Sequence, residues 1–384
     1  MNLEAIQAAL REQSLDGWLF YDHHHRDPIA YRILGLSDSL HVSRRWYYLI
    51  PAQGEPRKLT HRVESGKLAS LPGTGHVYSS WQELEDGLRT MLEPYKTLAM
   101  QYSPRNAIMY VSMVDAGTVE VLREMGKTIV SSADLVSRFE AVLTAEQIAS
   151  HYQAQKSIDE IVSEVWKYIA AGSRSEYQVM VWLREAMRRA GIADGYGPNV
   201  SVNENSSDSH YEPTAASSRQ IKQGDFLLID IWGRMDRPQS CFYDITWTGV
   251  VGREPTDRER QVFSLVAQAR DAAIKAVQDA FKAGRPIAGW EADDAARAVI
   301  RAAGFADYFT HRTGHSISYE THGNGANLDN LETHDERLIL PHTCFSVEPG
   351  IYLPEFGVRS EVNMLTEAGR ATVTGPIQTE LVRI

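Results

Sequence analysis

Residues 224–233 read GDFLLIDIWG, and residues 241–251 read CFYDITWTGVV. Both runs are mostly apolar and strand-like, yet Asp230 and Asp244 stand in their middles. A carboxylate inside a strand core is costly unless it is paired or bound to a cation. Gly, Arg, Pro, Gln and Ser lie between the runs and predict a hairpin, in which antiparallel pairing makes the two aspartates neighbours across one face.

Side-chain alternation gives the second run one polar face. Asp244 shares this face with Phe242, Thr246 and Thr248, whereas Cys241 points to the opposite side. Hydroxyl groups beside a carboxylate are what a polar site requires. A thiolate nucleophile at Cys241 is therefore not expected.

Two further carboxylates repeat this pattern near the end of the chain. Glu348 follows the strand-like TCFSV and precedes Pro-Gly, so it stands where a strand breaks into a turn. Glu361 lies in GVRSEVNML, where alternation places it on one face with Arg359 and Asn363. One region thus carries four acids in or beside apolar strands.

Residues 311–323, HRTGHSISYETHG, add three histidines. Four carboxylates and at least one imidazole predict a pair of hard or borderline divalent ions, and such a pair favours metal-assisted hydrolysis. His311 and His315 are spaced as in a helical HExxH zinc site, but Arg312 occupies the position of its glutamate and Gly314 disfavours a helix. We therefore expect His311 to support the site from behind.

In chain order, the settings LLIDIWG, YDITWTG, GHSIS, SVEPGIY and VRSEV resemble the pita-bread metallopeptidases, the family of aminopeptidase P, prolidase and methionine aminopeptidase, with creatinase as a metal-free relative. The resemblance covers residues 143–384 and implies an α+β pita-bread catalytic domain. Residues 1–142 are similar, more weakly, to the amino-terminal α/β domain of creatinase. Because methionine aminopeptidases normally lack such a domain, the aminopeptidase P and prolidase branch is favoured.

The resemblance also implies a role for each site residue. Asp230 would chelate one metal ion, His315 and Glu348 the other, and Asp244 and Glu361 would bridge the two. Glu348 would also act as general base. His322 would stabilise the tetrahedral intermediate, His210 would contact the substrate, and Arg359 would fix the carboxylates.

The implied activity is that of a dinuclear exopeptidase. It would hydrolyse the amino-terminal peptide bond of short peptides, before proline, by attack of a metal-bridging hydroxide. Manganese is the expected metal, although cobalt, zinc and iron use the same ligands. The family also implies a homodimer.

Two other functions are open on sequence grounds. One is a metal-dependent pita-bread hydrolase or lyase that acts on a non-peptide small molecule, and the other is a non-catalytic peptide-binding module. The chain departs from its relatives after His322, where Gly323-Asn324-Gly325 replaces an acidic residue and proline, and in the unusual DNLETHDER segment. These departures affect proline specificity more than hydrolysis.

Outside the site, the periodicity changes near residue 142. The first 140 or so residues alternate short strand-like and helix-like pieces, which predicts a small α/β domain. Long helical periodicity follows from Ala141, and a further helix is expected to begin at Thr256 as its N-cap.

The composition limits the partners. A formal net charge of −11 without a basic stripe argues against nucleic acid. The amino terminus has neither a signal peptide nor a membrane anchor pattern, so no membrane partner and a cytoplasmic location are expected. Cys241 and Cys344, the two cysteines, form no CxxC pair and are expected to be buried free thiols.

Overall fold

The computed structural model describes residues 1–384, which fold into two compact units, Met1–Phe139 and Glu140–Ile384. Each unit has its own sheets and its own apolar cores. No helix in either unit has both the length and the apolar character that crossing a membrane requires.

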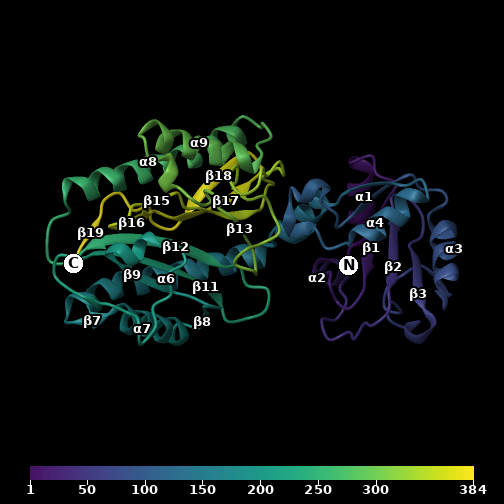
Figure 1. Ribbon diagram of the computed structural model, residues 1–384, viewed down its shortest axis with the longest axis horizontal. Coiled ribbons are helices and arrows are strands. Elements are labelled where there is room, and N and C mark those ends of the chain that lie inside the picture. Colours follow the sequence, from purple (N-terminus) through teal and green to yellow (C-terminus); the bar gives the residue numbers. More distant parts are fainter. The chain divides into compact units, whose positions relative to one another are not determined.

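The first unit is a six-stranded mixed sheet with helices on both faces (Figure 1). Alternation along the central strand β1 explains the two layers, because Trp18 and Phe20 enter one core while Leu19 and Tyr21 enter the other. The strand order is β4-β3-β2-β1-β5-β6. The strands are β1 (Gly17–Asp22), β2 (Trp46–Pro51), β3 (Arg57–His61), β4 (Thr74–Tyr78), β5 (Thr97–Met100) and β6 (Thr128–Ser131), and the helices are α1 (Leu3–Glu12), α2 (Pro28–Leu34), α3 (Trp81–Leu92), α4 (Ala116–Glu124) and α5 (Ala133–Val136).

The second unit opens with two helices that pack on the sheet containing the first two aspartates. Helices α6 (Ala145–Ala170) and α7 (Glu176–Arg189) each begin with a capping box, at Thr144 and Ser175. Their apolar faces cover one side of the sheet β19-β12-β11-β8, whose strand β11 also pairs with β9. The strands are β8 (Ile192–Ala193), β9 (Asn199–Val202), β11 (Phe226–Met235), β12 (Tyr243–Val250) and β19 (Val382–Arg383).

The remaining half of this unit has the same plan with different elements. Helices α8 (Asp257–Lys282) and α9 (Gly289–Ala302) share a core with a four-stranded sheet and a neighbouring hairpin. Thr256 is the N-cap of α8, as predicted. The sheet is β13 (Ser316–Ile317), β14 (Cys344–Val347), β17 (Val362–Glu367) and β18 (Arg370–Thr374), and the hairpin is β15 (Gly350–Tyr352) and β16 (Gly357–Arg359). A short separate pair, β7 (Arg174–Ser175) with β10 (Gln220–Ile221), belongs to the first half, next to α7.

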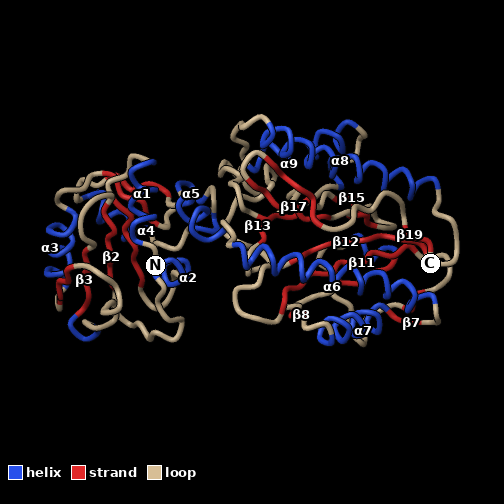
Figure 2. Tube along the Cα trace, turned by 180° about the vertical axis from the view of Figure 1, so that it is seen from behind, coloured by secondary structure: helices blue, strands red, loops and turns tan.

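Helices therefore lie on the two outer sides of the second unit, with strands between them, as Figure 2 shows. Along β11, Leu227, Ile229 and Ile231 enter the core under α6 and α7. The intervening Asp230 must then face the strands of the other half. The polar side chains predicted from the sequence thus lie where the two halves meet.

Candidate metal centre

The two strand aspartates lie on one face of the β11–β12 hairpin. Asp230 pairs with Thr246, and Asp244 pairs with Trp232, so the aspartates are diagonal neighbours on antiparallel strands. The predicted hairpin is confirmed. Thr246 lies between the two acids, and its hydroxyl is 3.2 Å from Asp230 Oδ1.

Glu361 and Arg359 reach the same place from the other half of the unit. The Thr246 hydroxyl donates to Glu361 Oε2 over 2.7 Å and accepts from Arg359 Nε over 2.9 Å. The Arg359 guanidinium also pairs with Asp230 and lies 3.8 Å from Glu348 Oε2. Arg359 is therefore the buried cation that partners the carboxylates from both halves.

His315 is placed by a close approach of two main chains. A Cβ on the preceding Gly314 would lie 2.0 Å from the carbonyl oxygen of Ser346, so only glycine fits there. The Ser346 hydroxyl accepts from the His315 amide over 2.9 Å and lies 3.1 Å from Glu348 Oε1. Ser346 thus fixes the imidazole and the carboxylate together.

The His315 ring presents a free lone pair to the acids. Its Nδ1–H donates to the Ser316 carbonyl over 3.2 Å, which leaves Nε2 3.4 Å from Glu348 Oε1 and 3.7 Å from Asp244 Oδ2. Burial and the nearby His322 lower the pKa of His315 to about 3. The imidazole is therefore neutral at physiological pH, the form that binds metal.

The acids repel one another, and Arg359 offsets only part of this repulsion. Burial, and then the charges of neighbouring carboxylates, raise the pKa values of Asp244 and Glu361 well above their usual range. Burial also raises the pKa of Asp230, against the opposing charge of Arg359. One guanidinium does not neutralise four carboxylates, so this buried group needs further positive charge.

The donor set fits divalent ions. One ligand atom each from Asp244, His315 and Glu361 lie within 4.8 Å of one another, and all three residues are buried. Asp230 and Glu348 lie beside this group through the contacts above. Carboxylate oxygens with a neutral imidazole nitrogen suit Mn, Co, Zn or Fe(II).

The other three predicted histidines surround this group at different depths. The exposed His322 ring packs edge-on against that of His315, with centroids 4.4 Å apart. His311 contacts no carboxylate, because its Nε2 bonds the Tyr352 hydroxyl over 2.7 Å. That hydroxyl in turn accepts from Arg359 over 3.3 Å, so His311 supports the acids from behind.

His210 is exposed on the loop between β9 and β10. Burial raises the pKa of the Asp230 carboxyl, and His210 is near enough to oppose this slightly, less than Arg359 and the Thr246 hydrogen bond do. Its loop is organised by Glu176, a fully buried acid at the start of α7. Glu176 accepts from the Tyr211 hydroxyl over 2.7 Å and from the main-chain amides of Val202 and Arg219 over 2.8 Å each.

Sequence reasoning missed Tyr352, Asn363 and Glu176 as supports of the site. Alternation puts Asn363 on the face of Glu361 but does not predict that its side-chain amide bonds both the N–H and the C=O of Asp244. Tyr352 follows Glu348 by four residues in PGIY, and only the folded β15–β16 hairpin brings it against Arg359. Glu176 is the first residue of a helix that begins with a capping box, and this pattern does not predict the buried partners of its carboxylate.

The two segments that depart from the expected family pattern lie next to each other, because Arg337 donates to the Asn324 carbonyl over 3.0 Å. The Gly323 amide donates to the Ser316 carbonyl over 2.7 Å, and Asn324 bonds Glu140 over 3.0 Å. In the following segment, Asp335 and Arg337 form a fully buried ion pair, and Asp335 also accepts from the Asn327 amide. The segment is therefore a fixed structure held by its own polar groups.

Comparison with known proteins gives the class. Residues 149–368 match metallopeptidase family M24, which is more than half of the chain. The chain belongs to this family and is a metal-dependent hydrolase.

The individual relatives agree with this class. The probable dipeptidase PepE of Mycobacterium tuberculosis is 27% identical over 334 residues, which cover 85% of this chain and 82% of that protein. The Xaa-Pro dipeptidase of Pyrococcus furiosus is 28% identical over 244 residues, 63% of this chain and 65% of that protein. Among solved structures, dipeptidase PepE from Mycobacterium ulcerans aligns with a TM-score of 0.71 at 23% identity, covering 100% of this chain and 96% of that one. The predicted α+β pita-bread fold is confirmed.

Proposed function

We propose that this peptidase removes the amino-terminal residue from short peptides or splits dipeptides, with preference for an Xaa-Pro bond. The observation that carries the proposal is the buried group of Asp244, His315 and Glu361, with Asp230 and Glu348 beside it. Its relatives are named as dipeptidases and as Xaa-Pro dipeptidases, which supports the choice of substrate.

Two divalent ions would be held by Asp230, Asp244, His315, Glu348 and Glu361. When bound, the ions supply a water of lowered pKa and polarise the scissile carbonyl. Manganese is the proposed metal, and a cytoplasmic homodimer is the proposed state of the protein. The oxygen-and-imidazole donor set suits Mn²⁺ among other divalent ions, and the family resemblance supports the homodimer.

Each nearby side chain has a part in the reaction. Glu348 accepts the proton of the attacking water, and the Ser346 hydroxyl beside its Oε1 keeps that oxygen oriented. His322 stands at the exposed edge of the group, where its imidazole can donate a hydrogen bond to the oxygen of the tetrahedral intermediate. His210 orients the substrate from the neighbouring loop.

Arg359 holds the geometry while the proton moves. Its guanidinium pairs with Asp230 and lies near Glu348, so it offsets the charge of whichever carboxylate is unprotonated. His311 and Tyr352 keep the guanidinium in place through the Tyr352 hydroxyl. These contacts act on the carboxylates and not on the substrate.

A small peptide panel tests the proposal. Protein loaded in turn with Mn²⁺ and Co²⁺ is assayed on Xaa-Pro dipeptides, Xaa-Pro-Yaa tripeptides and matched peptides without proline. We expect hydrolysis of at least one Xaa-Pro series and at least a tenfold lower kcat/KM for the matched peptides, about 1.4 kcal/mol. Failure on every peptide by metal-loaded protein would refute peptidase activity and favour a non-peptide substrate.

A matched pair of variants separates catalysis from metal binding. Glu348→Gln keeps the size of the side chain but removes the proton acceptor, so kcat should fall by ~100-fold or more. Glu160→Gln, a change of the same kind at an exposed position of α6, should leave kcat unchanged.

A further inference from the structure

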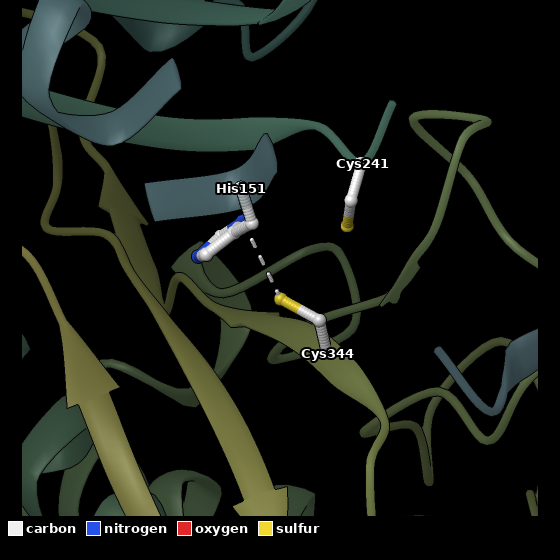
Figure 3. A group of neighbouring side chains, drawn as sticks. All are labelled: His151, Cys241 and Cys344. Carbon is white, nitrogen blue, oxygen red and sulfur yellow. Dashed lines mark hydrogen bonds between the residues drawn. The ribbon is translucent and has the colours of Figure 1, made fainter. Parts of the chain in front are cut away.

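A second group of metal-binding side chains lies outside the candidate metal centre. His151 of α6, Cys241 just before β12 and Cys344 of β14 offer one ligand atom each, and these atoms lie within 4.8 Å of one another. Figure 3 shows the Cys344 sulfur facing His151 along the dashed line, with the Cys241 sulfur on the other side of Cys344. We propose that these three residues bind one zinc ion that holds together three elements of the catalytic unit.

The distances are close to those of a zinc site. With Zn–S near 2.3 Å and Zn–N near 2.0 Å, ligand atoms around one zinc ion lie about 3.5 Å apart. Cys344 Sγ is 4.0 Å from His151 Nδ1. Because all three ligand atoms lie within 4.8 Å of one another, each pair needs to close by at most about 1.3 Å.

The hydrogen bonds of His151 suit a ligand that binds through Nδ1. In the metal-free protein, Nδ1–H donates to the Phe242 carbonyl over 2.6 Å, and Nε2 is 2.8 Å from the Thr374 hydroxyl. When Nδ1 gives its lone pair to an ion, the ring proton moves to Nε2 and donates to Thr374. A protein hydrogen bond on the second ring nitrogen is the usual arrangement for a metal-bound histidine.

The same shift frees a fourth ligand. The Phe242 carbonyl oxygen loses its donor from His151 and already lies 3.6 Å from Cys241 Sγ. It can complete a tetrahedral set of two sulfurs, one nitrogen and one oxygen. Four protein ligands make a closed site, which has a structural role and no position for substrate.

The charge of the two thiolates favours a divalent ion such as Zn²⁺ at this buried position. His151, Cys241 and Cys344 are all 0% exposed, and the two cysteines pack with Leu143, Ile317 and Leu365. A lone thiolate is costly there, and burial raises the pKa of the Cys344 thiol well above its usual range. Two thiolates and one Zn²⁺ sum to zero, so the loaded site is neutral, and the two thiol protons are released to solvent.

The site would act on the catalytic centre through the chain. Cys241 precedes Asp244 by three residues and Cys344 precedes Glu348 by four. His151 belongs to a helix that packs on the β11–β12 sheet. An ion here would tie β12 of one half to β14 of the other, next to the acids that each strand carries.

Sulfur ligation gives a readout that the catalytic centre cannot produce. Protein from zinc-supplemented cells is dialysed against a chelator, its metal content is measured, and the zinc is then exchanged for Cd²⁺. We expect about one chelator-resistant zinc per chain and, with Cd²⁺, a near-ultraviolet thiolate-to-cadmium absorption band. The acids and His315 have no sulfur, so Cd²⁺ bound to them gives no such band.

Variants locate the site. Cys344→Ser and Cys241→Ser should each lose the resistant zinc and at least half of the band, whereas Glu361→Ala, which damages only the catalytic centre, should keep both. Wild-type protein without the zinc and the band would overturn the proposal, even if a cysteine variant fails to fold. A disulfide between the two cysteines, shown by the absence of free thiols on titration of the unfolded protein, would also overturn the proposal. A band that persists in both serine variants would do the same.

Discussion

Asn363 joins the two halves of the catalytic unit through the main chain of Asp244. Its Oδ1 accepts from the Asp244 N–H over 2.9 Å and its Nδ2 donates to the Asp244 C=O over 2.8 Å. Asn363 is 0% exposed, so no water replaces either bond. Asn363→Leu fills nearly the same volume and removes both partners.

The expected loss follows from the two orphaned main-chain groups. Each buried and unsatisfied polar group costs about 1–3 kcal/mol, so the free energy of unfolding of the second unit should fall by about 2–6 kcal/mol. For a unit of this size, each kcal/mol lowers Tm by about 2–4 °C. Because Asp244 moves with its backbone, affinity for Mn²⁺ should fall as well.

The assay is urea unfolding of metal-free protein, followed by calorimetric titration with Mn²⁺. Gln261→Leu, the same kind of change at an exposed position of α8, is the control and should change stability by less than about 0.5 kcal/mol. Asn363→Asp retains the acceptor but sets a carboxylate against the Asp244 carbonyl, so it should also destabilise. A loss below about 1 kcal/mol for Asn363→Leu, with unchanged Mn²⁺ affinity, would refute the reasoning.

Three other changes give distinct results. Glu361→Ala should abolish activity and lower the metal content, and activity loss with full metal retention would show that it does not bridge the ions. Glu176→Gln should lower kcat/KM with metal content unchanged, because it loosens the loop that carries His210; equal kcat/KM would contradict this role. In metal-free protein, burial and neighbouring carboxylates raise the pKa values of Asp244 and Glu361. The contribution of these acids to the free energy of unfolding is therefore present at low pH and is lost as pH rises through the raised pKa values. Mn²⁺ competes with protons for these carboxylates, so the rise in Tm on Mn²⁺ binding should grow from acidic to neutral pH. A rise in Tm that does not depend on pH would show that the ligands do not exchange protons for the metal ion.

The sequence predicted the parts of the site that depend on strand alternation. Asp230 and Asp244 interrupt apolar runs, and their neighbourhood follows from the hairpin and the period of two. Glu348 marks the end of β14 for a similar reason, because Pro-Gly stops a strand. These features are local, and local patterns are visible in a chain.

The supports could not be predicted because they are long-range and side-chain specific. The contact of Asn363 with Asp244 joins positions 119 apart in the chain, and nothing in VNML distinguishes this amide from a surface one. The position of Tyr352 depends on the pairing of β15 with β16. Likewise, alternation predicts that Cys241 points away from Asp244, but only the folded structure shows that Cys241 lies beside Cys344 and His151.

The catalytic unit has two separate apolar cores, one under α6 and α7 and one under α8 and α9. This division determines where the unit opens in small local motions. The buried acids and Arg359 lie between these cores, beside a small apolar cluster that includes Leu143 and Ile317, so we expect small opening motions to concentrate at the polar part of this seam. Amide exchange in β12 and β17 should then slow when the ions bind, while exchange inside the two cores changes little. Metal loading would thus set the stiffness of the seam as well as its chemistry.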